Sequence, residues 1–183
     1  MLGVLTVLKG NRVLLKAIEK DDLNVLYDIW CDEEVRKYDG LYSTVPSKEI
    51  IIKNFGAFIL GQKKYLSIIN EENIVVGYIT YEDVMDLTST YILGITLGKD
   101  FWNKGYGQDS VKTLMKYLFI NKVAHRIELE VVDLNKGALR CYEKCGFRIE
   151  GKKRERYFYQ GNYSDVIIMG ILKEEYYNLI SNK

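Results

Sequence analysis

Histidine, cysteine and proline are scarce in this chain, whose 183 residues include one His, three Cys and one Pro. A structural zinc site needs about four clustered Cys or His ligands, so the sequence predicts no metal centre. A Ser-His-Asp hydrolase would depend on His125 as its only imidazole, which argues strongly against that class. Three cysteines without a secretory leader predict a reduced, cytoplasmic protein and no disulfide framework.

The chain also lacks an excess of either charge and any long apolar run. Lys and Arg number 26 against 25 Asp and Glu, whereas a general nucleic-acid-binding protein usually carries a marked basic excess. No apolar run approaches the ~18 residues that a membrane span requires. We therefore expect neither nucleic acid nor a membrane as a partner, and the length fits one domain over residues 1–183.

The spacing of apolar residues predicts an α+β fold in which helices cover one mixed sheet. Strands are expected over residues 12–17, 65–70, 74–82, 90–97, 125–132, 147–159 and 163–172. Helices are expected to begin at Asp21–Asp22 and at Pro46–Ser47, and to span 107–121 and 138–145. The second of these helical stretches is expected to bury an apolar side made of Ile50, Ile51, Phe55, Phe58 and Ile59.

A glycine-rich segment lies between an expected strand and an expected helix, with the sequence Asp-Phe-Trp-Asn-Lys-Gly-Tyr-Gly-Gln-Asp-Ser over residues 100–110. Gly105 and Gly107 would leave backbone N–H groups free at a helix N-terminus, which suits a phosphate or pyrophosphate, and Lys104 adds charge. A P-loop is excluded because Tyr106 follows Gly105, and a dinucleotide fingerprint would need a third glycine at Ser110. A plain helix start with two packing glycines is the alternative.

A second segment, Asn-Lys-Gly-Ala-Leu-Arg-Cys-Tyr-Glu-Lys-Cys-Gly-Phe, spans residues 135–147. The Asn135 amide follows a strand and can bridge splayed backbone, and Ala138 keeps the next helix thin enough for close approach. Tyr142 is four residues after Ala138 and therefore shares its helix face. Taken alone, the pattern favours an amphipathic helix with a core tyrosine.

Together the two segments resemble the GNAT N-acetyltransferase superfamily. The first matches its pyrophosphate-binding motif, commonly Q/R-x-x-G-x-G/A, and the second matches its N-x-x-A-x-x-x-Y-x-x-x-G-F pattern. The resemblance extends from Arg12 to the closing strand. Residues 151–155 and 161–169 are similar to the branch that includes ribosomal-protein N-terminal acetyltransferases and spermidine acetyltransferases. The resemblance implies a GNAT-like α+β fold with a single mixed, mostly antiparallel sheet flanked by helices.

The resemblance also implies a reaction, in which a primary amine attacks the thioester of acetyl-CoA directly. Tyr142 would protonate the departing thiolate as general acid. The acceptor would be a protein N-terminus or a small-molecule amine, with a polyamine or an aminoglycoside as alternatives, and a homodimer is possible. The implied cofactor-binding residues are Ile95, Thr96, Leu97, Lys104, Gly105, Tyr106, Gly107, Gln108, Asn135, Ala138 and Tyr142.

The sequence departs from the family pattern at two positions, of which the first removes an expected side-chain contact and the second leaves the general base unassigned. Trp102 stands where the family has Gln or Arg, and residues 91–93 lack the glutamate that many relatives carry. Glu82 and Asp83, at the end of the third expected strand, are the candidate bases, with Glu130 as a further one. For each of them an ordinary solvated or salt-bridged carboxylate is the favoured alternative. An alkyl ammonium with a pKa near ~10.4 costs about 4–5 kcal/mol to deprotonate at pH 7, and an α-amino group costs much less.

Other readings of the same residues stay open. A non-catalytic acyl-CoA-binding module is the alternative to an enzyme, although Tyr142 and the intact Gly105–Gly107 turn favour the enzyme. Cys141 or Cys145 could carry an acyl group, but helix packing is the expected role of both. The run from Lys152 to Arg156 is expected to be a solvated strand face.

Overall fold

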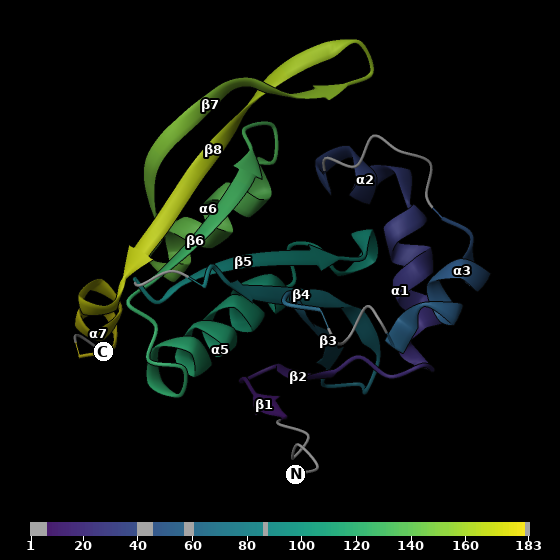
Figure 1. The fold of residues 1–183 in the computed structure, drawn as a ribbon, viewed down its shortest axis with the longest axis horizontal. Coiled ribbons are helices and arrows are strands. Elements are labelled where there is room, and N and C mark those ends of the chain that lie inside the picture. The colour runs from purple at the N-terminus through teal and green to yellow at the C-terminus, as the bar shows by residue number, and fades with distance from the viewer. Residues whose placement is uncertain (1–6, 40–45, 57–60, 86–87, 182–183) are drawn as a thin grey trace.

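The computed structural model describes residues 7–39, 46–56, 61–85 and 88–181. Eight strands form one sheet in the order β1-β2-β3-β4-β5-β6-β8-β7 (Figure 1). Their bounds are β1 Leu8–Lys9, β2 Val13–Ala17, β3 Lys64–Asn70, β4 Val75–Asp83, β5 Thr90–Leu97, β6 Arg126–Val132, β7 Arg148–Tyr159 and β8 Asn162–Leu172. Within the described residues only β5 and β6 pair in parallel, so the expected mixed, mostly antiparallel sheet is confirmed.

Helices cover the sheet on both faces. Their bounds are α1 Asp22–Cys31, α2 Glu33–Asp39, α3 Lys48–Lys53, α5 Tyr106–Ile120, α6 Lys136–Cys145 and α7 Lys173–Ser181, with a 3-10 turn η1 at Lys99–Phe101. Leu118 of α5, Tyr142 of α6 and Tyr176 of α7 belong to one buried cluster, on what we term the α5 face. Leu23 of α1 packs in a second cluster with Tyr78 of β4, on the opposite α1 face.

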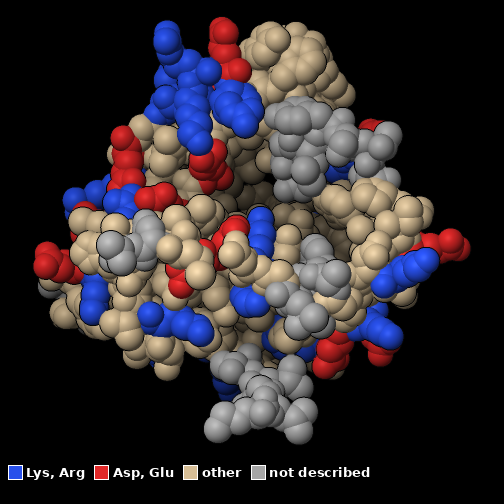
Figure 2. Space-filling view, viewed as in Figure 1, with Lys and Arg blue, Asp and Glu red and all other residues tan. Residues whose placement is uncertain are grey.

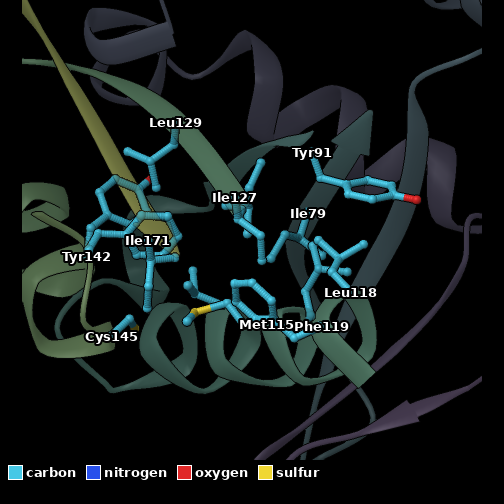
Figure 3. Packing of buried hydrophobic residues seen from close by; sticks show 14 of the residues in the cluster. Ile79, Tyr91, Met115, Leu118, Phe119, Ile127, Leu129, Tyr142, Cys145 and Ile171 are labelled. Atoms are coloured by element: carbon cyan, nitrogen blue, oxygen red, sulfur yellow. The ribbon is translucent and has the colours of Figure 1, made fainter. Parts of the chain in front are cut away.

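The main core forms where α5 lies against the sheet (Figure 3). The fully buried residues of α5 recur at helical spacing and include Val111, Leu114, Met115 and Leu118. Ile127 of β6 and Ile171 of β8 have no exposed side-chain surface and pack in the same cluster. Alternate residues of β6 are polar, so the sheet presents an apolar face to α5 and a charged face to the other side.

Four elements lie outside the sequence-based expectations, namely β1, α2, η1 and α7. Helix α7 is held by a tertiary contact, because Tyr176 stacks on Phe119 of α5 with ring centroids 4.7 Å apart. The apolar side expected for the second helical stretch is wrong for Ile50, which is 51% exposed, although Phe55 is buried. Phe58 and Ile59 lie outside the described residues.

Pairing between β5 and β6 stops before either strand ends. Partners are found only as far as Ile92 and Glu128, although β5 continues to Leu97 and β6 to Val132. Beyond these partners the two strands diverge, and Figure 1 shows the wedge between them. We call residues 93–97 and 129–132 the splayed edges.

The hairpin of β7 and β8 extends past the rest of the sheet and curves toward α2 (Figure 1). Its pairing is interrupted between Lys153 and Tyr157, and the extra residues are held by Asp165, whose carboxylate accepts from the Glu155 amide at 2.8 Å. Beyond this bulge, the Tyr157 hydroxyl donates to the Lys37 carbonyl of α2 at 2.5 Å. We call residues 154–165 the arm.

The packing of α5 yields a stability prediction. Leu118 is fully buried, whereas Ile120, two residues later on the same helix, is 47% exposed. Leu118→Ala should lower the free energy of unfolding by about 2–5 kcal/mol, because it removes buried methyl groups and leaves a cavity. Ile120→Ala should change it by less than about 1 kcal/mol. Chemical denaturation of both variants checks this, and equal losses would contradict the assigned packing of α5.

Candidate active site

The splayed edge of β5 presents unpaired backbone. The Thr90 carbonyl accepts from Val84 of the β4 side, and the Gly98 amide donates to Val76 of β4. Backbone groups alternate between the two sides of a strand, so those of Leu93, Ile95 and Leu97 point toward β6. Since β6 has diverged there, the edge can accept an extended ligand that carries amide groups.

A turn with free amides follows this edge. Gly105 has φ +86° and caps the N-terminus of α5 without a side-chain hydrogen bond. The first helical bond there runs from the Asp109 amide to the Gly105 carbonyl at 3.1 Å. Within the described residues, the amides of Tyr106, Gly107 and Gln108 have no hydrogen-bond acceptor. We call residues 102–108 the glycine turn, and its helix dipole and free donors suit an anion.

The N-terminal strands brace the glycine turn. The Arg12 guanidinium donates to the Lys104 carbonyl, lies 4.7 Å from the Tyr106 ring centroid and pairs with Glu71 at 2.5 Å. This hydrogen bond lowers the pKa of Glu71. The Asp109 carboxylate accepts from the amides of residues 11–13 at 2.7–3.2 Å. The turn is therefore held from residues nearly one hundred positions away in the sequence.

Gly107 is the second glycine of the turn, and its lack of a side chain has a steric reason. A Cβ there would lie 3.3 Å from Leu97 and 3.7 Å from the Cys141 sulfur, so the glycine lets α5 approach both β5 and α6. The exposed Lys104 ammonium lies 5.7 Å from the Phe101 ring centroid, near the same end of α5. The cation adds positive potential to the turn.

Helix α6 borders the opening with the residues of the second segment. Asn135 is the N-cap of α6, and its side-chain oxygen accepts from the Ala138 amide at 3.0 Å. Tyr142 is only 5% exposed and packs against Phe147 at a centroid distance of 5.9 Å. Figure 3 shows its ring in the cluster that includes Leu129 and Ile171.

The chemistry of Tyr142 follows from this burial. Burial raises the pKa of the phenol well above its usual range, so the group keeps its proton at neutral and moderately alkaline pH. Among the described residues, its hydroxyl has no hydrogen-bond partner. A hydroxyl without a partner among the described residues is available to a ligand that enters the opening.

The two cysteines of α6 pack against α5. The Cys145 thiol is 3% exposed and donates to the Gln108 carbonyl at 3.7 Å. A hydrogen bond with Cys145 lowers the pKa of Cys141. The packing of α6 on the first turn of α5 explains both side chains, in line with the expected structural role.

The two candidate carboxylates of β4 lie on opposite faces of the sheet. Glu82 pairs with Ile92 and Asp83 with Tyr91, so successive side chains point to opposite sides. The Asp83 carboxylate accepts from the Met85 amide at 2.8 Å and interacts with the Tyr91 hydroxyl on the α5 face. Glu82 points to the α1 face. The structure therefore does not bring the two together.

Glu82 lies in a row of residues at the point where pairing stops. The register places Glu82, Ile92 and Glu128 side by side on β4, β5 and β6. Glu128 pairs with Arg126 at 2.8 Å, and Glu130 pairs with Lys153. In the described part of the chain, Glu82 has no cationic partner. A half-buried carboxylate therefore faces the α1 side of the opening without a counter-ion.

The molecule is hollowed near the divergence of β5 and β6 (Figure 1, Figure 2). Figure 2 shows a depression at the centre of the molecule, between the wedge of β5 and β6 and helix α2, with acidic and basic side chains at its margin. A cavity of about 260 Å³ lies between α2 and the arm, lined by Glu33, Arg36, Tyr159 and Gln160. His125 directly precedes β6, at the end of the strand that lies away from this opening. Its amide donates to the Ser89 carbonyl, and its carbonyl accepts from the Lys173 amide.

Comparison with known proteins assigns this arrangement to a family. The acetyltransferase (GNAT) domain model matches residues 12–148. The uncharacterised N-acetyltransferase p20 of Bacillus licheniformis is 29% identical over 170 residues, which is 91% of this chain and 96% of that protein. Spermidine N(1)-acetyltransferase of Vibrio cholerae is 26% identical over 180 residues, or 92% and 98% of the two chains.

Solved structures show the same fold. A GNAT-family acetyltransferase from Bacillus anthracis superposes with a TM-score of 0.79 at 25% identity, covering 92% of this chain and 99% of that one. The Vibrio cholerae spermidine N-acetyltransferase in complex with CoA and spermine superposes with a TM-score of 0.83 at 23% identity, covering 91% and 98%. The chain belongs to the GNAT acetyltransferase family. It is an N-acetyltransferase that uses acetyl-CoA to acetylate amines.

The glycine turn yields a binding prediction. Gly105→Val should raise the Kd for CoA by about tenfold or more, because it disturbs several amide donors that would each contribute about 0.5–1.5 kcal/mol. Gly161→Val is the matched control, since Gly161 has φ +82° but lies at the tip of the β7–β8 hairpin. Both variants should lose similar stability. Calorimetry that finds equal CoA affinity in both would contradict the assignment.

Proposed function

We propose that acetyl-CoA binds along the splayed edge of β5, with its pyrophosphate on the amides from Gly105 to Gln108. One continuous feature carries the proposal, namely that the free donors of the glycine turn lead into the part of β5 that β6 no longer pairs with. There the Ile95 backbone points toward the opening, and the Leu97 carbonyl is held by the Trp102 indole. Pantetheine carries amide groups, which pair with a strand edge as an added strand would. A cofactor lying there reaches the end of β5–β6 pairing with its thioester.

For three of the expected cofactor-binding residues, we propose how each would act on acetyl-CoA. The backbone of Thr96 points toward β4, so Thr96 would meet the cofactor only through its side chain. Ala138 leaves room on the α6 side for the pantetheine chain. Asn135 acts through the position of α6, because its side-chain oxygen is already bonded to the Ala138 amide.

The acceptor amine would attack the thioester carbonyl from the α1 face. Attack forms a carbon–nitrogen bond and gives a tetrahedral intermediate whose cationic nitrogen loses its extra proton to water. Collapse of the intermediate breaks the carbon–sulfur bond. Tyr142 would then give its proton to the thiolate of CoA as general acid. Its raised pKa keeps the phenol protonated throughout the pH range in which an amine can react, but also makes it a weaker acid than an exposed tyrosine, so the proton would move as the carbon–sulfur bond breaks.

We assign the ammonium-attracting carboxylate and proton acceptor to Glu82 in preference to Asp83. Glu82 lies beside Ile92 at the end of β5–β6 pairing and has no cationic partner among the described residues. Asp83 is engaged with Tyr91 on the face that α5 covers. Loss of the amine proton to Glu82, directly or through water, would supply the free amine.

The proposed acceptor is a small-molecule alkyl amine that carries positive charge. Glu82 is an acidic group on the α1 face without a cationic partner among the described residues, whereas Glu128 and Glu130 on the neighbouring β6 are paired with Arg126 and Lys153. The Vibrio cholerae relative, 26% identical, is named as acting on spermidine. Deprotonation of an alkyl ammonium costs about 4–5 kcal/mol at pH 7, and a nearby carboxylate offsets part of that cost. A protein N-terminus is the alternative acceptor.

Three further expectations stay predictions. They are a single acetyltransferase domain over residues 1–183, a homodimer and a cytoplasmic location. No helix in the described ranges is long and apolar enough to cross a membrane.

An amine panel tests the acceptor and the role of Glu82 together. Release of CoA from acetyl-CoA is measured with spermidine, a simple alkyl monoamine, an aminoglycoside and a short peptide with a free N-terminus. We expect a small-molecule amine to give the highest kcat/KM. With that amine, Glu82→Gln should lower kcat/KM by about 10²-fold, with a higher KM and a lower kcat.

Asp83→Asn is the matched control for Glu82, because it changes the next carboxylate on the same strand. It should leave kcat/KM within about threefold of the parent. A peptide that outperforms every small amine would overturn the small-molecule proposal. Equal pH profiles of kcat/KM in the parent and Glu82→Gln would remove Glu82 from the mechanism.

The role of Tyr142 is tested by removing only its hydroxyl. Tyr142→Phe should lower kcat by about 10- to 10⁴-fold, the lower end because a thiolate leaves readily without help, while the Kd for CoA changes little. The loss should be constant between pH 6 and 9, since the raised pKa keeps the parent phenol protonated throughout. Tyr176→Phe is the control, being a buried tyrosine of α7 outside the site. Full kcat in Tyr142→Phe would make Tyr142 a packing residue.

A further inference from the structure

Trp102 contacts two parts of the molecule that serve different substrates in the proposed function. Its indole N–H donates to the Leu97 carbonyl at 2.9 Å. Its ring lies 6.1 Å from the ring of Tyr38 on α2, measured between centroids. The first contact fixes the end of the splayed edge of β5, and the second reaches the helix that borders the central depression.

Helix α2 continues this connection to the arm. Lys37, the residue before Tyr38, accepts the hydrogen bond from the Tyr157 hydroxyl at 2.5 Å. Val35 anchors the helix and is 4% exposed. Two adjacent residues of one short helix therefore contact the glycine turn and the arm, so a shift of the turn changes the position of both borders of the depression.

The conformation of the glycine turn is specific enough to transmit such a shift. Trp102 ends η1 in an extended conformation, and both Asn103, at φ +58°, and Gly105, at φ +86°, have left-handed backbones. An anion bound to the amides of the turn favours this one backbone arrangement over others. Binding of the anion thereby fixes the indole that holds Leu97 and Tyr38.

We infer that Trp102 is a positioning residue that couples acetyl-CoA binding at the glycine turn to the placement of α2 over the acceptor site. The inference rests on the proposed function. Coupling between two binding sites is reciprocal, so an acceptor that favours the same position of α2 raises the affinity for acetyl-CoA by the same factor. The residue departs from the family motif, which commonly has Gln or Arg at that position.

Hydrogen exchange measured by mass spectrometry tests the coupling with CoA alone as the probe. In the parent, saturating CoA should slow amide exchange in the glycine turn and also in α2, residues 33–39, by about tenfold. In Trp102→Leu, the glycine turn should still be protected while α2 changes by less than about twofold. Exchange in α2 that responds equally in both proteins would overturn the inference.

Two further variants separate the contacts of Trp102. Trp102→Phe keeps a ring against Tyr38 but lacks the N–H, so α2 should remain protected while the Kd for CoA rises about two- to tenfold. Trp30→Phe is the matched control, because Trp30 on α1 is the only other tryptophan and its ring packs against Tyr27. It should behave as the parent in both measurements.

Kinetics provide a second readout, with the amine that the parent acetylates best. Trp102→Leu should raise the KM for that amine about five- to tenfold while kcat stays within about threefold. An unchanged amine KM would contradict the coupling. Failure of the proposed function is distinguishable from this, because CoA would then leave the glycine turn unprotected in the parent itself.

Discussion

Parallel pairing between β5 and β6 ends at Ile92 and Glu128, and the site depends on this early end. Had the strands stayed paired to Leu97 and Val132, the backbone groups of Leu93 and Ile95 would be occupied by the neighbouring strand. The divergence instead opens the sheet from the α5 face to the α1 face. Cofactor and acceptor can therefore approach one point from two sides, which direct transfer between them requires.

The divergence is held open by elements that are distant in sequence. Helix α5 fills the α5 face with apolar side chains, and its first turn is held against β2 by Asp109. Helix α6 is fixed by its Asn135 cap and by the packing of Cys145 on α5. The anion-binding part of the site is thus a helix end, whose free amides and dipole are directed at an anion.

The fold was largely accessible from sequence because its strands and long helices carry clear apolar periods. The local structure of the two motif segments also follows from their own residues. Gly105 permits a left-handed backbone at the start of α5, and Asn135 caps the N-terminus of α6. The contacts of Arg12 and Trp102 had no such signal. Arg12 directly precedes β2 and meets the glycine turn through the placement of that strand between β1 and β3. Trp102 contacts Tyr38, which lies in a helix without strong periodicity.

Residue alternation could have separated Glu82 from Asp83, but only the register identifies the face that meets the opening. That register depends on the pairing of Ile92 with residues of two other strands. The exposure of Ile50 has a related cause, because an apolar period predicts burial only where a partner surface exists.

The clamp of Asp109 on residues 11–13 also bears on how the site assembles. The two partners are separated by 96–98 residues, so the first strands are synthesised long before the carboxylate that fixes them. The contact is non-local, and such contacts form late because a long loop must close first. A ligand that binds only the closed arrangement stabilises it in proportion to the logarithm of its concentration. Acetyl-CoA at the glycine turn would accordingly act on the folding of the N-terminal strands as well as on catalysis, and the cellular supply of the cofactor would help to set how long the protein persists.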